Sequence, residues 1–299
     1  MLSPSLRIRH KVVLIDTLPP LGQVIKDHGL LSNKKVVKGL GQNFLLDPNI
    51  TDRIAQAAQP LAGFNIFEVG PGPGGLTRSL LKAGADHIYA IERDQNCVIA
   101  LQPLVDASQG RLVLVQADAL KIVPQTVASS PIKIVANLPY NVGTQLLINW
   151  LKNLECLRSL TLMFQREVAL RIVAQPGNCD YGRLSILCQY LCQVDRLFDL
   201  PPQAFTPSPK VYSSVVQLYP KQLSNKEKSL LPYLEKVTMA AFGQRRKMIR
   251  KSLKPLFGEE RLQEILPFLQ ISPLERPENL TLDHYRQLAE FYQAALLSD

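Results

Sequence analysis

The stretch Glu68-Val-Gly-Pro-Gly-Pro-Gly-Gly-Leu-Thr77 decides the fold that this sequence predicts. It follows an apolar run at residues 66–69 and precedes a helical pattern at residues 76–81, so it lies where a strand turns into a helix. Its glycines at positions 70, 72 and 75 match a pattern in which absent side chains let the backbone approach a nucleotide-type ligand. A tight structural turn is the alternative, because this pattern alone is a weak signal.

Runs typical of buried strands alternate with helical patterns around the glycine-rich stretch. The strand-like runs lie at residues 66–69, 88–91, 112–115, 132–135 and 160–164, and the helical patterns at residues 50–58, 76–81, 97–104 and 145–154. This alternation predicts an α/β fold with a Rossmann-like parallel sheet and helices on both faces, which two later runs complete to seven strands. Residues 194–198 and 211–218 are typical of closing strands, and alternation in the second predicts antiparallel pairing at an edge.

The ends of this pattern suggest where the domains divide. Asp47 followed by Pro48 is typical of a helix start, so the helix over residues 50–58 leads into the core. After residue 220 helical patterns rich in Leu, Lys, Gln and Glu replace the strands. We therefore expect an entry segment at residues 1–35, an α/β domain at 36–220 and a small all-α domain at 221–299.

Charge and composition indicate a polyanionic partner. The 299 residues include 34 Lys and Arg against 25 Asp and Glu, a formal charge of +9. Residues 221–260 contain ten Lys or Arg and four acids, so they carry most of the excess. Five cysteines without a CxxC pair and four scattered histidines give no metal pattern, so we expect no metal. Cysteines of this kind are typical of free thiols in a reducing compartment, and no apolar run near the start is long enough for a signal peptide or membrane span, so we expect a cytoplasmic protein. A transit peptide in the basic first fifteen residues is a weaker alternative.

Two acids follow the second and third predicted strands. Glu92 comes about twenty residues after the glycine loop, where an acid can accept hydrogen bonds from both ribose hydroxyls of an adenosine-type cofactor. Asp118 follows the next strand and could accept a bond from the adenine amino group. Each alone could be a solvated loop carboxylate, but the carboxyl ends of neighbouring strands meet where open sheets of this kind hold ligands.

The tetrapeptide Asn137-Leu138-Pro139-Tyr140 follows the fourth predicted strand. An amide oxygen from Asn137 and the Leu138 carbonyl could each accept one hydrogen from an adenine amino group, and so direct its nitrogen toward a sulfonium methyl. Pro139 would stiffen the turn and Tyr140 would stack on an extruded base. An ordinary Pro turn with a packing tyrosine is the alternative.

A basic run near the carboxyl end is a candidate nucleic-acid surface. Phe242, Ile249 and Leu253 are expected to form the buried stripe of one helix and to leave its cations exposed to phosphates. The candidate RNA-binding residues are Arg245, Arg246, Lys247, Arg250 and Lys251, with Phe205 and Lys210 from a proline-rich loop beside the adenine pocket. A basic face that only confers solubility is the alternative, as is core packing for Phe205.

Several motifs together resemble the ribosomal RNA adenine dimethylases, a family that includes the bacterial dimethyladenosine transferase and the erythromycin-resistance methylases. The resemblance spans about residues 18–253. It is carried by Gly41-Gln-Asn-Phe-Leu-Leu-Asp47, the glycine loop, Ala90-Ile-Glu-Arg-Asp94, the tetrapeptide, Phe164-Gln-Arg-Glu-Val-Ala169, Tyr181-Gly-Arg-Leu-Ser185, Phe205-Thr-Pro-Ser-Pro-Lys-Val211 and Phe242-Gly-Gln-Arg-Arg-Lys247. Leu40 and Met248 depart from the family pattern, at positions where a basic or aromatic residue and Thr are usual.

This resemblance implies the fold of the class I methyltransferases and S-adenosyl-L-methionine as the cofactor. Carried over by position, it implies cofactor contacts from Asn43, Leu45, Gly70, Glu92, Asp118 and Asn137, and the glycine loop adds Gly72. The amino-terminal segments Leu18-Pro-Pro-Leu21 and His28-Gly-Leu30 resemble the housekeeping branch. That branch dimethylates two adjacent adenosines in the 3'-terminal hairpin of small-subunit (16S) ribosomal RNA, so we expect a pre-30S particle as the partner of a chain that is monomeric when free.

Three other functions remain open at this point. A nicotinamide-dependent dehydrogenase could use the same glycine loop, but it leaves the tetrapeptide and the basic run unexplained. A resistance-type enzyme would methylate large-subunit RNA, and only the amino-terminal resemblance argues against it. A non-catalytic RNA-binding assembly factor would keep the basic run without needing Asn137, Tyr140 and Glu92.

Overall fold

The computed structural model describes residues 14–32 and 41–298 and divides into two compact units. Unit 1 comprises residues 1–146 and 202–210, and unit 2 comprises residues 147–201 and 211–299. The expectations for Leu40 and for residues 1–13 lie outside the described residues. The boundaries of these units do not coincide with the domain boundary expected at residue 220. That domain boundary stays a prediction.

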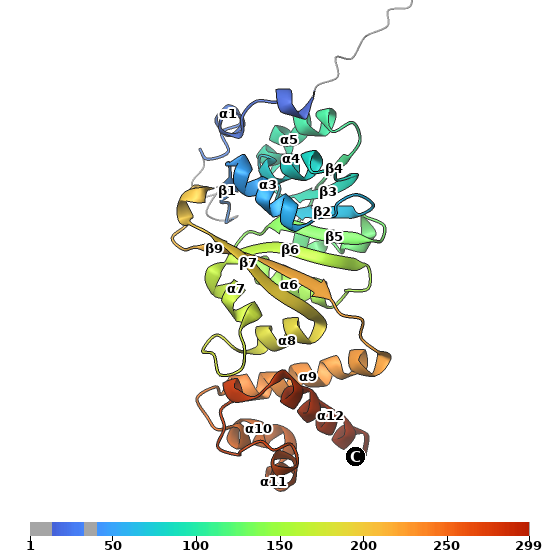
Figure 1. The fold of residues 1–299 in the computed structure, drawn as a ribbon, viewed down its shortest axis with the longest axis vertical. Helices are drawn as coiled ribbons and strands as arrows, with labels where there is room; N and C mark the ends of the chain where they lie inside the picture. Colours follow the sequence, from blue (N-terminus) through green and yellow to red (C-terminus); the bar gives the residue numbers. More distant parts are fainter. Residues whose placement is uncertain (1–13, 33–40, 299) are drawn as a thin grey trace, which may run out of the picture. The chain divides into compact units, whose positions relative to one another are not determined.

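Four parallel strands form the sheet of unit 1 (Figure 1). They are β2 (Asn65–Val69), β3 (His87–Glu92), β4 (Leu112–Gln116) and β5 (Ile132–Asn137), in the order β4-β3-β2-β5. Apolar side chains make β2 and β5 almost fully buried along their lengths, as expected for strands covered on both faces. All four strands therefore end at the same edge, where the loops that follow them meet.

Helices alternate with these strands, as the apolar periodicity predicts. They are α1 (Leu21–Asp27), α3 (Pro48–Ala57), α4 (Gly75–Lys82), α5 (Gln95–Ala107) and α6 (Gly143–Leu151), the last of which begins in unit 1. The predicted helix start is confirmed, because the Asp47 side chain accepts a hydrogen bond from the Asn49 amide and Pro48 is the first helical residue. Thr51, Ile54 and Ala55 form the buried face of α3.

A second, two-stranded sheet joins two distant parts of unit 1. Strand β1 (Phe44–Leu45) pairs antiparallel with β8 (Phe205–Thr206), with Phe44 opposite Thr206 and Leu45 opposite Phe205. Phe44, Leu45 and Phe205 are all buried. Backbone pairing and side-chain burial at Phe44 and Leu45 therefore both hold the end of the segment at residues 41–45.

Three antiparallel strands form the sheet of unit 2. They are β6 (Leu157–Gln165), β7 (Cys192–Leu200) and β9 (Ser213–Pro220), and β9 lies between the other two. The prediction that residues 211–218 pair antiparallel is confirmed, but their expected place at an edge is wrong. Residues 213–218 of β9 are buried without alternation, as suits a central strand, whereas β7 has the mixed exposure of an edge.

The remaining helices of unit 2 are α7 (Arg166–Val173), α8 (Arg183–Leu191), α9 (Asn225–Gly243), α10 (Ile249–Phe257), α11 (Glu259–Phe268) and α12 (Leu282–Ser298). Helix α9 begins with a capping box in which Ser224 and Glu227 satisfy each other's backbone amides. Figure 1 shows α9 and α12 next to each other, and the two helices are in contact. The part of the chain after residue 220 is helical, as predicted.

The strands of the two units together have the order β4-β3-β2-β5-β6-β9-β7. The predicted α/β fold with a Rossmann-like seven-stranded sheet and a helical carboxyl-terminal part is thereby confirmed.

Candidate functional site

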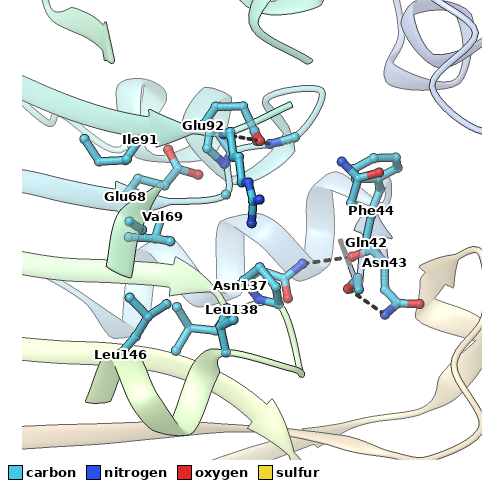
Figure 2. A pocket seen from close by; sticks show the side chains of 18 of the residues that line it. Gln42, Asn43, Phe44, Glu68, Val69, Ile91, Glu92, Asn137, Leu138 and Leu146 are labelled. Atoms are coloured by element: carbon cyan, nitrogen blue, oxygen red, sulfur yellow. Dashed lines mark hydrogen bonds between the residues drawn. The ribbon is translucent and has the colours of Figure 1, made fainter. Parts of the chain in front are cut away.

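A pocket in unit 1 lies at the carboxyl ends of β2, β3, β4 and β5 (Figure 2). It brings together the segment at residues 41–45, the glycine loop, two acids and the tetrapeptide after β5. Every residue predicted to bind cofactor or to act in catalysis lines it: Asn43, Leu45, Gly70, Gly72, Glu92, Asp118, Asn137, Leu138, Pro139 and Tyr140. Parallel sheets of this kind hold ligands at this edge.

The glycine loop has the backbone that the sequence predicts. The structure also shows a second reason for its glycines, which the sequence does not reveal. Gly70 and Gly72 have positive φ angles of 67° and 56°, which L side chains rarely adopt. A Cβ at Gly72 would lie 2.8 Å from the Phe44 ring, and one at Gly75 would lie 2.6 Å from the Leu45 carbonyl oxygen. These glycines are therefore needed for the packing of β1 against the loop, in addition to any approach of a ligand.

Glu92 is held by backbone amides at the end of β3. Its Oε1 accepts hydrogen bonds from the amides of Arg93 at 2.7 Å and Asp94 at 2.8 Å, and its Oε2 accepts one from the Gly72 amide at 3.1 Å. The side chain is only 6% exposed, and this burial raises the pKa of the carboxyl although the three amides favour its charged form. Glu92 thus has a fixed position that links β3 to the glycine loop.

A second carboxyl, Glu68, lies in the same pocket and was not singled out in the sequence. It is 1% exposed on β2, and its Oε2 has no hydrogen-bond partner among the described residues. Burial, together with the negative charge of Glu92, raises its pKa to about 8, so it is mostly protonated at neutral pH. The sequence signal is an acid inside an otherwise apolar strand, because such a carboxyl is seldom buried without a purpose.

Asp118 follows β4 and has a structural bond on one of its two oxygens. Its Oδ1 accepts a hydrogen bond from the Leu120 amide at 3.0 Å, which caps a short 3-10 helix. Its Oδ2 lies 3.7 Å from a guanidinium nitrogen of Arg93. The carboxylate is therefore oriented by the cap on one oxygen and by a nearby guanidinium on the other.

Asn137 is the last residue of β5 and its amide is oriented by the segment at residues 41–45. Its Nδ2 donates a hydrogen bond of 3.0 Å to the Asn43 carbonyl oxygen, as Figure 2 shows. An amide whose donor is already used presents a neutral acceptor to whatever enters the pocket.

The rest of the tetrapeptide forms the turn into α6. The Pro139 carbonyl accepts hydrogen bonds from the amides of Val142 and Gly143, which closes the turn. Leu138 is 2% exposed, whereas Tyr140 is partly buried at the pocket wall. A Cβ at Gly70 would contact the Pro139 ring at 3.7 Å, so the turn packs directly against the glycine loop.

The two candidates from the proline-rich loop have different environments. Phe205 is 3% exposed in strand β8 and is not among the residues that line the pocket. This agrees with the packing alternative, so its role beside an adenine stays a prediction. Lys210 is exposed.

The basic segment at residues 244–254 lies in unit 2, and the expectation of one continuous helix there is wrong. Helix α9 ends at Gly243, residues 244–248 form a turn, and α10 begins at Ile249. The burial of Ile249 and Leu253 is confirmed, while Phe242 packs at the end of α9 against Tyr285. The break arises because residues 245–247 have no apolar side chain that could continue the buried stripe.

The cations of the basic segment are mostly exposed, with one exception. Arg246, Lys247, Arg250 and Lys251 point to solvent. Arg245 instead donates a hydrogen bond to the Cys179 carbonyl and lies 3.7 Å from Glu278. Arg245 therefore joins the turn to the loop before α8.

Other chemistry in the described residues is limited. No cluster of three His, Cys, Asp or Glu side chains that could hold a metal ion occurs in residues 14–32 and 41–298. None of the described helices is long and apolar enough to cross a membrane. The five cysteines are free thiols.

Comparison with solved structures supports the fold. A dimethyladenosine transferase from Plasmodium falciparum superposes with a TM-score of 0.71 at 24% identity, covering 83% of this chain and 97% of that one. The 23S rRNA methyltransferase ErmE gives a TM-score of 0.66 at 23% identity, covering 84% of this chain and all of that one.

Comparison with sequences identifies the family. A protein from Rhizobium johnstonii is 52% identical over 279 residues, and one from Sinorhizobium medicae is 51% identical over 278 residues. Both are named ribosomal RNA small subunit methyltransferase A, and each alignment covers 92% of this chain and 98% of the relative. The family described as ribosomal RNA adenine dimethylase matches residues 33–294, so the resemblance seen in the motifs is confirmed and the chain belongs to that family.

Proposed function

We propose that this protein transfers methyl groups from S-adenosyl-L-methionine to N6 of adenosines in small-subunit ribosomal RNA. Membership of the ribosomal RNA adenine dimethylase family and the names of its relatives support the reaction and the class of RNA. The pocket supplies what the reaction needs, namely a nucleoside-type cradle next to neutral hydrogen-bond acceptors. The dehydrogenase alternative is set aside, because the family match spans both the pocket and the basic segment.

The residues of the pocket fit the cofactor. Glu92 would accept hydrogen bonds from the ribose hydroxyls of the cofactor, and Asp118 would accept one from the amino group of the cofactor's adenine. Bound there, the cofactor supplies a methyl group on a sulfonium, whose departure needs neither a metal nor an acid. The remaining contacts are assigned to Asn43, Leu45, Gly70, Gly72 and Asn137.

The observation that carries this proposal is the orientation of the Asn137 amide. Because its Nδ2 donates a hydrogen bond of 3.0 Å to the Asn43 carbonyl, its Oδ1 is the atom left to accept a hydrogen from the amino group of the substrate adenine. The Leu138 carbonyl would accept the second hydrogen. With both hydrogens held, the nitrogen lone pair is directed along the line of methyl transfer.

The other two residues of the tetrapeptide would hold the base. Pro139 stiffens the turn through its ring and through the two amides that its carbonyl binds. Tyr140, at the pocket wall, would stack on an adenine that has left its helix. The enzyme would thus act by orientation, with no side chain that must take up a proton before transfer.

The RNA would be bound in part by cations of unit 2. Arg246, Lys247, Arg250 and Lys251 are exposed and would contact phosphates, which gives affinity that falls with salt. Arg245 would also contact phosphate, but its side chain would move less because it bonds to the Cys179 carbonyl and pairs with Glu278. Lys210 and, where its ring becomes available, Phe205 complete the proposed RNA contacts of the chain.

The finer features of the proposal come from the family branch. The substrate would be two adjacent adenosines in the 3'-terminal hairpin of 16S RNA, both dimethylated, within a pre-30S particle in the cytoplasm. The free protein would be a monomer. The names of the relatives favour the small subunit over the large one.

One experiment tests the substrate. Undermethylated small subunits, mature small subunits and large subunits are each incubated with the protein and methyl-labelled cofactor, and the modified nucleotides are mapped. We expect label on two neighbouring adenosines of undermethylated small subunits alone. Label on large-subunit RNA would favour the resistance-type function, and RNA binding without label in any particle would favour the assembly-factor function.

A further inference from the structure

One carboxylate in unit 2 holds two arginines from different elements. Asp199 lies on β7, and its Oδ1 is 2.6 Å from Nη1 of Arg196 on the same strand. Its Oδ2 is 3.4 Å from Nε of Arg166 at the start of α7. The Ser214 hydroxyl on β9 donates a further hydrogen bond of 2.6 Å to Asp199. Both guanidinium groups are therefore oriented by the two oxygens of one partly exposed carboxylate.

A β-bulge makes this arrangement possible. Residues three apart on a regular strand point to opposite faces of the sheet, so Arg196 and Asp199 would ordinarily face away from each other. The pairing of β7 with β9 shifts between Arg196, opposite Val216, and Phe198, opposite Val215. The extra residue, Leu197, reverses the alternation and turns Arg196 to the face of Asp199. Bulges often aim a side chain in this way next to functional sites.

The group keeps an exposed positive charge. The side chains of Arg166 and Arg196 are 50% and 34% exposed, and two cations share one anion. Partial burial opposes ionisation of Asp199, but the hydrogen bonds from Ser214 and Arg196 and the two nearby charges outweigh it, so the pKa of Asp199 is lowered. The carboxylate is charged at neutral pH, and a net positive charge remains for a ligand.

An exposed aromatic residue is joined to Arg166 through the backbone. The Arg166 amide donates a hydrogen bond of 2.9 Å to the Tyr212 carbonyl, which brings the residue before β9 next to the start of α7. Tyr212 is 48% exposed. Oriented guanidinium groups together with an exposed aromatic side chain are typical of surfaces that bind single-stranded RNA, where cations contact phosphates and rings stack on unpaired bases.

We propose that Arg166, Arg196 and Tyr212 form a second RNA-binding surface, in addition to the basic segment at residues 244–254. The arginines would each contact a backbone phosphate, and the tyrosine would stack on an unpaired base of the same strand. This inference rests on the proposed function only in taking ribosomal RNA as the ligand. The planar guanidinium groups, which match the geometry of phosphate oxygens, and the exposed ring favour RNA over a protein partner.

The test measures the affinity of the full-length protein for undermethylated small subunits and for naked small-subunit RNA over a range of salt concentrations. The variants are Arg166→Gln, Arg196→Gln, Tyr212→Ala and Tyr212→Phe. Each Gln variant should lower affinity for both ligands about 5-fold at low salt, with a shallower salt dependence. Tyr212→Ala should lower it about 10-fold, whereas Tyr212→Phe keeps the ring and should stay within about 2-fold.

Arg158→Gln is the matched control. Arg158 is exposed near the other end of β6 from Arg166, about 26 Å along the strand, and its loss removes the same charge. Circular dichroism and thermal unfolding check that each variant is folded, and Gln avoids placing a second carboxylate next to Asp199.

The outcomes separate this inference from the proposed function. Folded Arg166 and Arg196 variants that bind RNA as tightly as the Arg158 control would overturn the second surface, whatever the methylation assay gives. Weaker binding to intact subunits with unchanged binding to naked RNA would assign the surface to a ribosomal protein and would overturn it as well. A wild-type protein that binds RNA through these residues but transfers no methyl group would overturn the proposed function alone.

Discussion

The pocket of unit 1 and the basic segment of unit 2 are both polar, yet they are built in opposite ways. In the pocket, Glu92 and Asn137 have fixed partners, and Glu92 alone receives three backbone amides at 2.7–3.1 Å. In the basic segment, Arg246, Lys247 and Arg250 project into solvent.

This difference shows how the protein can divide its work. Chemistry that depends on direction needs side chains whose rotamers are fixed before the ligand arrives. Attraction of a polyanion needs only charge, and flexible cations can follow the phosphates of a large RNA. A small change in the pocket should therefore cost much more than a similar change in the basic segment.

The largest effect is expected for Asn137→Ala. Loss of the amide removes the bond to the Asn43 carbonyl and the proposed acceptor for the amino group of the substrate adenine, so turnover should fall about 1000-fold. Cofactor binding should weaken and remain measurable by calorimetry. Turnover is measured by transfer of labelled methyl groups to undermethylated small subunits. Activity within tenfold of wild type in this variant would remove the orientation mechanism.

The next effect concerns the buried acid of the pocket. The pKa of Glu68 is about 8 in the folded protein against an ordinary 4.5. Between these pH values the folded protein therefore keeps the proton on Glu68, whereas the unfolded chain loses it. The free energy of unfolding should fall as the pH rises from about 4.5 to 8. Glu68→Gln lacks this titration and should be more stable than wild type at pH 8 by a few kcal/mol. Denaturant unfolding at several pH values tests this, and a difference that does not change with pH would contradict it.

A smaller effect is expected where the two motifs of the pocket pack together. Gly72→Ala places a methyl group 2.8 Å from the Phe44 ring at a positive φ of 56°, and should lower stability by about 1–3 kcal/mol. Gly84→Ala is the control for backbone strain, because its φ is 92° and a Cβ there meets nothing within 4 Å. Adding Phe44→Leu should recover part of the loss at Gly72 and none at Gly84. Equal losses for the two Ala variants would show that the ring does not matter.

The smallest effect is expected in the basic segment, where two neighbouring arginines make a matched pair. Arg246→Glu should weaken RNA binding about 10-fold at low salt, with little loss at high salt and no change in stability. Arg245→Glu should weaken binding and also lower the melting temperature, because it breaks the bond to Cys179 and repels Glu278. Identical melting temperatures for the two variants would contradict the structural role of Arg245.

Much of the architecture follows from local sequence patterns. Asp47 and Pro48 predict a helix start, and the glycine loop predicts a strand-to-helix turn, because caps and turns depend on residues next to each other. Glu92, Asp118 and Asn137 could be placed in one pocket since each follows a strand of a parallel sheet.

The rest depends on contacts between distant residues. Nothing near Phe44 indicates that it pairs with residue 206 or that its ring requires a glycine at position 72. The break before Ile249 was missed because the charge run resembles one helix, although no apolar residue at 245–247 anchors it. The bulge that turns Arg196 toward Asp199 is visible only in the register of β7 with β9.

The segment from Gly41 to Asp47 contacts a different part of unit 1 at almost every step, and this limits how its length can change. The contacts follow in order: a Cβ at Gly41 would meet Asn141, the Asn43 carbonyl binds Asn137, the Phe44 ring packs on Gly72, the Leu45 carbonyl lies over Gly75, and Asp47 caps α3. Deleting or inserting one residue here would shift all of these contacts at once. Seven residues thus act as a spacer of fixed length between the turn after β5 and the glycine loop, and conservative substitutions should be tolerated there far better than any change in length.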